Sequence, residues 1–135
     1  CKLSIIWTIN PVTYAGVNSM TEALRSRFIG SVWGYPSNND MSSVVDWTDI
    51  DEITIKNPLL TLAQDIYALK LKGDVEYALS IRDLVQFTHH YREIQDEIKK
   101  PLEVALNEVV MIKFSEPAER ELIRLRIEDT FDVKL

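Results

Sequence analysis

The sequence predicts a short α/β segment followed by an all-helical region, so that the chain is mostly helical overall. Two runs rich in β-branched and aromatic residues, at positions 5–9 and 29–36, are typical of strands. From Ile53 onward, apolar residues recur at helical spacing instead. We therefore expect three parts among the 135 residues: an α/β part (1–36), a linker (37–52) and a helical domain (53–135).

The first strand run stops at Asn10-Pro11. Proline has no N–H to give to a sheet ladder, and it holds the preceding residue in an extended conformation. Asn10 is therefore expected at the carboxyl end of a buried strand. Open α/β sheets bind their ligands at this edge, so Asn10 is a candidate site residue, although an Asn-Pro pair can also simply close a turn.

A short helix is expected after this strand, and two cations lie at its end. Ser19 and Glu22 have the spacing of a capping box, with Asn18 as the alternative cap. Arg25 and Arg27 follow at the C-terminal end, where the helix dipole favours positive charge. They are either a solvated helix end or contacts to an anion such as phosphate.

The predicted linker is polar and acidic. Its carboxylates Asp46, Asp49, Asp51 and Glu52 could suggest a metal site. The spacing of an EF-hand, with its central glycine and final glutamate, is absent. We expect a solvated acidic linker that holds no metal.

Four helices are expected in the helical domain, joined by short loops into a small bundle. Prolines, glycine and capping residues set their limits, which are Asn57-Pro58 to Gly73, Ser80 (with Asp83) to Ile98, Pro101 to Ile112, and Ser115 to about Phe131. The apolar positions predicted to face inward are Leu59, Leu62, Ala63, Ile66, Leu69 and Leu71; Ile81, Leu84, Val85, Thr88, Tyr91 (or His90), Ile94 and Ile98; Leu102, Ala105, Leu106, Val109, Val110 and Ile112; and Leu122, Ile123, Leu125 and Ile127.

Arg82 occupies an unusual position, in the first turn of the second of these helices. A positive charge there opposes the helix dipole. The placement is explained if Arg82 contacts an anion, and an always-charged guanidinium fork suits phosphate oxygens. The alternative is an ordinary surface arginine.

A pair of histidines, His89-His90, precedes Glu93 in the same helix. His89 and Glu93 are i and i+4 on one face, which is a spacing that metal sites use. The pattern matches neither HExxH nor HxxEH, and no third ligand is identified. We therefore expect structural histidines and assign no metal ligand.

Charge and composition restrict the class of protein. The net charge of −6 argues against general nucleic-acid binding. No apolar run is long enough for a transmembrane helix, and no secretory signal is visible. Cys1 is the single cysteine, so we expect a cytoplasmic protein without an internal disulfide. Because the chain begins without methionine and inside an apparent strand, we expect it to be the C-terminal portion of a longer one.

The order strand, Asn10-Pro11, a loop with Gly16, then Glu22-Ala-Leu-x-x-Arg27-Phe resembles the second half of an AAA+ ATPase core, in its MoxR-like branch. The resemblance implies the C-terminal end of a P-loop core. In that family the strand-end asparagine, here Asn10, is the sensor 1 residue that orients the attacking water. The arginine before phenylalanine, here Arg27, is the finger that reaches the neighbouring subunit's nucleotide.

The segment Ala78-Leu-Ser-Ile-Arg82-Asp-Leu84 is similar to the LSxRxL opening of the family's sensor 2 helix. The resemblance thus implies that the helical bundle is the lid of the ATPase. Arg82 would then contact the γ-phosphate of nucleotide bound in its own subunit. Arg25 is a candidate for a further nucleotide contact. Ile9 departs from the family, which often has Met or Gln there, without changing a proposed role.

The family uses ATP and Mg²⁺ and assembles as a ring, commonly a hexamer, to remodel or load a partner protein. In this chain none of the four glycines forms a GxxxxGK(S/T) loop, and no apolar strand ends in Asp-Glu to hold magnesium. We therefore expect the isolated chain neither to bind nucleotide nor to hydrolyse it. The alternative function is a non-catalytic helical module for protein–protein interaction.

Overall fold

The computed structural model describes residues 34–46 and 50–135, apart from the side chain of Glu52. The chain divides into two units, residues 1–34 and 35–135, and the description below concerns the second. The two predicted strands, up to residue 33, and the predicted short helix lie outside the described residues. Gly34–Pro36, at the end of the second predicted strand, form no regular secondary structure.

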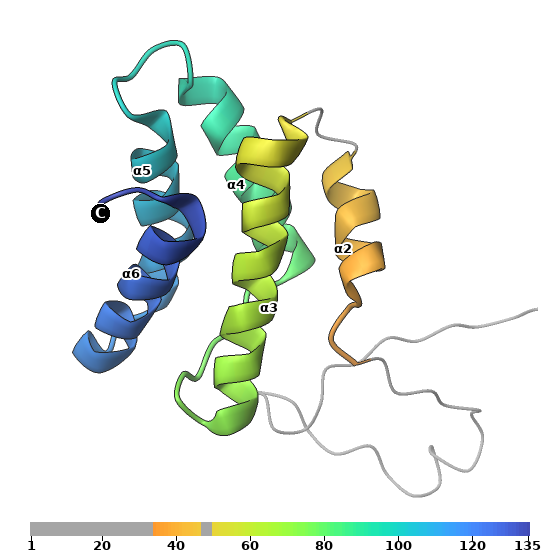
Figure 1. Ribbon diagram of the computed structural model, residues 1–135, viewed down its shortest axis with the longest axis vertical. Coiled ribbons are helices and arrows are strands. Elements are labelled where there is room, and N and C mark those ends of the chain that lie inside the picture. The colour runs from red at the N-terminus through yellow and green to blue at the C-terminus, as the bar shows by residue number, and fades with distance from the viewer. Residues whose placement is uncertain (1–33, 47–49) are drawn as a thin grey trace, which may run out of the picture. The chain divides into compact units, whose positions relative to one another are not determined.

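Every regular element among the described residues is a helix, and Figure 1 shows their arrangement. The helical prediction for residues 53–135 is thus confirmed. In chain order the elements are α2 (Asn38–Val45), the π-helix η2 (Glu52–Lys56), α3 (Asn57–Lys72), α4 (Ile81–Ile94), α5 (Pro101–Ala105), the π-helix η3 (Leu106–Val110), the 3₁₀-helix η4 (Met111–Lys113) and α6 (Pro117–Phe131).

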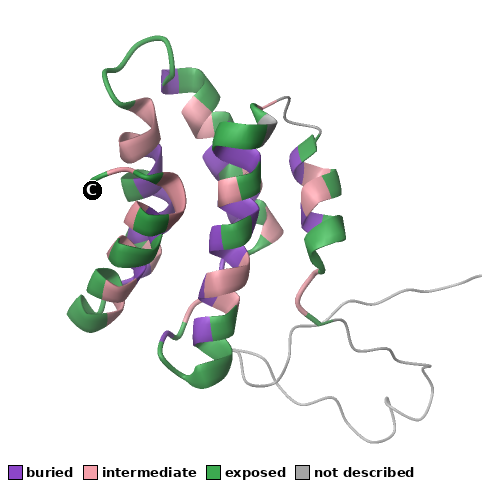
Figure 2. Cartoon of the chain, viewed as in Figure 1, coloured by how far each residue is buried: buried purple, intermediate pink, exposed green. Residues whose placement is uncertain are grey.

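These helices pack around one apolar core. Helix α3 contacts α2 and α6, while α4 contacts α2, α5 and η3. Figure 2 shows buried stretches alternating with exposed ones along the helices, as expected where one face of each helix is buried. The largest fully buried side chains are Phe87, Phe114, Met41, Leu59, Leu62, Ile66, Leu79, Leu84, Leu106, Ile123, Ile127 and Val45.

Local chemistry sets the limits of α3 as predicted. Pro58 lies in its first turn, where a missing N–H costs nothing. Gly73 follows its last residue with φ of 84°, and its N–H bonds back to carbonyls of the last turn. An L side chain is strained in this left-handed conformation, so glycine is favoured there.

The segment predicted as a linker contains a helix that the sequence analysis did not foresee. Ser37 and Asp40 form a capping box at the start of α2. Met41 and Val45 lie one turn apart on this helix, and both are fully buried. The three apolar residues of α2, Met41, Val44 and Val45, are a weak periodic signal in so polar a segment. Helix α2 becomes part of the core because α3 and α4 supply the partners.

Four residues predicted to face inward are exposed: Leu71, Ile98, Ile112 and Leu125. Ile98 lies beyond the end of α4 at Ile94, so helical spacing no longer applies to it. Ile112 follows the π-helix η3, whose wider turns break the α-helical register. Leu125 lies between the buried Ile123 and Ile127, on the opposite side of α6.

Two further details differ from the prediction. Phe87, which was not among the predicted inward residues, is fully buried and stacks on Tyr91 with ring centroids 6.3 Å apart. Ser115 was predicted to cap the last helix, but Glu116 holds the N-cap position there, without a side-chain capping bond. The extended backbone at Glu116 and the proline that follows are sufficient to start α6.

Candidate functional site

Arg82 is the predicted site residue that the structure describes. It is the second residue of α4, confirming its predicted place in the first turn, and its side chain is exposed. Among the described residues it makes no hydrogen bond or ion pair. Asn10, Arg25 and Arg27 lie outside the described residues, so their positions relative to Arg82 are not described.

The next residue, Asp83, is buried and holds the start of α4 in place. One carboxylate oxygen, Oδ2, accepts hydrogen bonds from the Tyr77 hydroxyl at 2.6 Å and from the Ser80 N–H and hydroxyl at 2.8 and 2.7 Å. The other, Oδ1, lies 3.0 Å from Nζ of Lys113, which belongs to η4. The first turn of α4 is therefore bonded both to the preceding loop and to a later element of the chain.

The electrostatics of Asp83 follow from these contacts. Burial by itself would raise the pKa of this carboxyl group, but the hydrogen bonds from Tyr77 and Ser80 and the contact with Lys113 lower it below its ordinary value. Asp83 is therefore ionised at neutral pH. Its negative charge is compensated inside the cluster formed by Tyr77, Ser80, Asp83 and Lys113, which we call the Asp83 cluster.

The exposed side of the same turn is suited to an anion. The first amides of a helix have no partner within the helix, and the dipole places partial positive charge at that end. In α4 the N–H of Asp83 is already bonded to Ser80, so the amides concerned are those of Ile81 and Arg82. Arg82 adds a full positive charge there. Because the Asp83 carboxylate faces Lys113 and the hydroxyls, it does not neutralise Arg82 by a direct contact.

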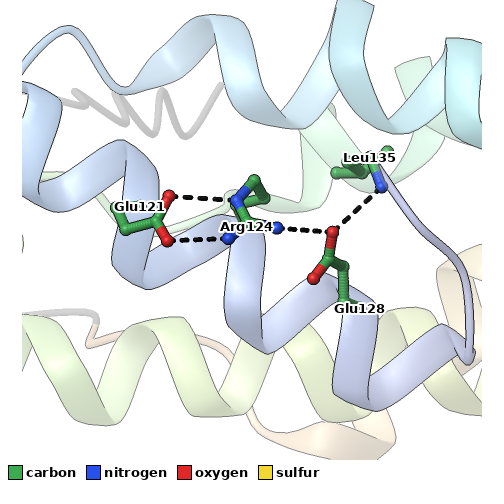
Figure 3. A network of polar contacts seen from close by, with 4 residues as sticks. All are labelled: Glu121, Arg124, Glu128 and Leu135. Carbon is green, nitrogen blue, oxygen red and sulfur yellow. Dashed lines mark hydrogen bonds and ion pairs between the residues drawn. The ribbon is translucent and has the colours of Figure 1, made fainter.

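Other described arginines differ in this respect. Arg124 of α6 pairs with Glu121 and Glu128 at 2.7 and 2.6 Å, and Glu128 also accepts the N–H of Leu135 (Figure 3). Arg120 donates to the carbonyls of Met111 and Phe114 at 3.1 and 3.0 Å. These two guanidinium groups already have partners, so they are less suited than Arg82 to receive a ligand.

Arg126 of α6 resembles Arg82 in being exposed and in making no such contact among the described residues. It lies in the middle of its helix, where the backbone amides are bonded within the helix. Arg126 therefore shares the charge of Arg82 but has no helix N-terminus beside it.

The two histidines lie beside a shallow groove of about 520 Å³ between α4 and η3. Nε2 of His90 lies 2.6 Å from a carboxylate oxygen of Glu108, while His89 and Glu93 line the groove. Within the described residues, no group of three His, Cys, Asp or Glu side chains is placed to hold a metal ion. His90 thus has a structural partner that links two helices.

Sequence reasoning identified Ser80, Arg82 and Asp83 but missed Lys113 and the hydroxyl of Tyr77. The serine and aspartate are three residues apart and carry a recognisable capping signal. Lys113 lies on a different element, and nothing in its local sequence indicates a buried carboxylate as its partner. Such a contact becomes visible only when the chain is folded.

Comparison with known proteins assigns no family. No protein-family profile matches the chain, and neither the curated proteins nor the solved structures contain a match to it. In the part of the chain that the structure describes, no helix is long and apolar enough to cross a bilayer.

Proposed function

We propose that this chain is the C-terminal portion of a MoxR-like AAA+ ATPase that couples ATP hydrolysis to the remodelling or loading of a partner protein. Residues 53–135 are then its helical lid, residues 1–36 belong to its α/β core, and residues 37–52 link the two. The observation that carries the proposal is the exposed Arg82 without a partner in the described residues, at a helix start that the buried Asp83 holds in place.

The order of motifs along the chain supports the same proposal. An asparagine at a predicted strand end, an Arg-Phe pair after a predicted helix and an arginine in a capped first turn follow one another as in the family. In the proposal Asn10 orients the attacking water and Arg27 acts on the neighbouring subunit's nucleotide in a ring that is hexameric, as is common in the family. Arg25 provides a second contact.

The described residues fit a nucleotide phosphate at Arg82. A guanidinium presents several N–H donors in a planar fork, which matches phosphate oxygens better than a point charge does. Bound ATP with Mg²⁺ supplies the phosphoryl group that water attacks. Arg82 would hold and partly neutralise the terminal phosphate, while the Asp83 cluster keeps the first turn of α4 rigid, so that little reorganisation is needed on binding.

The test uses the full-length protein and compares Arg82→Ala with Arg126→Ala. Both substitutions remove one exposed arginine that makes no hydrogen bond or ion pair among the described residues. We expect Arg82→Ala to lower turnover and weaken ATP binding, and Arg126→Ala to leave both unchanged. Equal effects of the two variants would mean that Arg82 contributes only general charge, which would contradict the proposal.

Mixed rings separate the two proposed arginine roles. Each mutant is mixed with a variant whose P-loop lysine is replaced and which cannot bind nucleotide. An Arg27→Ala subunit still binds ATP, and the intact Arg27 of a neighbouring P-loop variant can act on that nucleotide. Activity should therefore return in the mixed ring. An Arg82→Ala subunit carries the defect at its own site and should not be rescued. An upstream coding sequence without a P-loop would instead support a helical interaction module.

A further inference from the structure

Tyr35, the first residue of the helical unit, is held at two points. Its ring stacks on that of Tyr67 in α3, with centroids 3.9 Å apart and planes within 6° of parallel. Its hydroxyl donates a hydrogen bond of 2.5 Å to the backbone carbonyl of Leu79. One side chain therefore contacts both α3 and the residue that directly precedes the cap of α4.

Leu79 is a rigid attachment point. Its side chain is fully buried, and Ser80, the N-cap of α4, follows it directly. Arg82 lies only three residues after Leu79. A bond at the Leu79 carbonyl therefore constrains the backbone from which Arg82 extends.

The hydroxyl of Tyr35 is suited to this role. Burial, with smaller contributions from Tyr67 and Asp83, raises the pKa of Tyr35 to about 12. The group is therefore a protonated donor at any physiological pH. A phenylalanine would stack on Tyr67 equally well, so packing alone does not explain the hydroxyl.

We propose that Tyr35 is a positioning residue: through its bond to the Leu79 carbonyl it holds the backbone at the start of α4 and thereby sets the position of Arg82. Gly34 is bonded covalently to Tyr35, and Pro36 restricts the backbone of Tyr35 to extended conformations. The stacking on Tyr67 and the bond to Leu79 together restrain the backbone from which the first turn of α4 begins. The part of this inference that concerns nucleotide rests on the proposed function.

The first experiment needs no nucleotide. Tyr35→Phe keeps the stacked ring and removes the hydroxyl, and Tyr67→Phe is the matched control, since it alters the partner ring but leaves the bond to Leu79. We expect Tyr35→Phe to speed hydrogen exchange of the Asp83 and Leu84 amides, which are hydrogen-bonded to Ser80, about fivefold relative to the rest of the unit. Unchanged exchange there, or a uniform increase over the whole unit, would overturn the inference.

The second experiment measures ATP hydrolysis in the full-length protein. Tyr35→Phe should raise KM for ATP with a smaller effect on kcat, since it displaces Arg82 without removing it. Combined with Arg82→Ala it should add nothing to the loss caused by Arg82→Ala alone. Additive losses would overturn the link to Arg82. If the protein hydrolyses no ATP, the proposed function fails, and the exchange experiment still decides whether Tyr35 positions the turn.

Discussion

Asp83→Asn and Asp40→Asn form a matched pair of substitutions that isolates the contribution of the Asp83 cluster. Both aspartates are the third residue of a helix whose N-cap is a serine, and both form a capping box with that serine. Asp40 is exposed, and within residues 34–46 and 50–135 its hydrogen-bond partner is Ser37. Asp83 is buried; it also accepts a hydrogen bond from the Tyr77 hydroxyl and forms an ion pair with Lys113.

The expected difference follows from these contacts. An asparagine at position 83 must present its NH₂ group either to Lys113 or to the three donors on the other side, so one set of bonds is lost in either orientation. Hydrogen bonds to charged groups contribute about 1.5–3 kcal/mol each, and breaking a fully buried ion pair costs about 3–5 kcal/mol. Because Lys113 keeps 29% of its side chain exposed and can reach water, we expect a loss of about 2 kcal/mol. The loss for Asp40→Asn should be clearly smaller.

Denaturant unfolding of the two variants measures this difference. The transition midpoint should fall for Asp83→Asn with an unchanged slope, because the surface exposed on unfolding stays the same. If Asp83→Asn destabilised the protein no more than Asp40→Asn, the contacts with Tyr77 and Lys113 would contribute nothing, and the rigid first turn proposed for α4 would lose its support.

The difference in folding stability between the natural protein and Asp83→Asn should depend on pH. The pKa of Asp83 is lower in the folded chain than in the unfolded chain, where it is about 3.9. Its stabilisation is therefore fully present above about pH 5 and is lost as the pH falls through the folded pKa. The stability gap between the natural protein and Asp83→Asn should narrow on acidification below about pH 4. A gap that stayed constant down to about pH 2 would show that the carboxylate charge is not what stabilises this turn.

Two further predictions concern packing and the backbone. Gly73→Ala should cost about 1 kcal/mol, seen as a lower melting temperature, because the backbone is left-handed there. Apart from the two chain neighbours, no residue lies within 4 Å of the added methyl, so a clash would not explain the loss. An unchanged melting temperature would contradict the cap assignment. Phe87→Ala should cost about 3–5 kcal/mol in denaturant unfolding, since the ring is fully buried. Leu71→Ala, at a position 71% exposed, should cost below about 0.5 kcal/mol, and the reverse order would contradict the described core.

Most helix limits of the helical unit could be predicted from local features of the sequence. Pro58, Gly73, Ser80 and Pro101 mark helix limits in the sequence, and the structure places helix ends at or beside each of them. These signals work from sequence alone because a cap or a fixed φ angle depends on the residue itself and its immediate neighbours. The placement of Arg82 in a first turn follows from the same signals.

Burial and long-range pairing were decided only by the tertiary structure. Helix α2 packs into the core although its segment is polar, and Leu71 stays exposed although it continues an apolar stripe. The partner of Asp83 is a lysine on a different element, and the hydroxyl of Tyr35 reaches Leu79, 44 residues away. Periodicity shows which face of a helix is apolar. Which side chains are in contact depends on where the other helices end and how they cross, and the packing of all the helices around one core determines both.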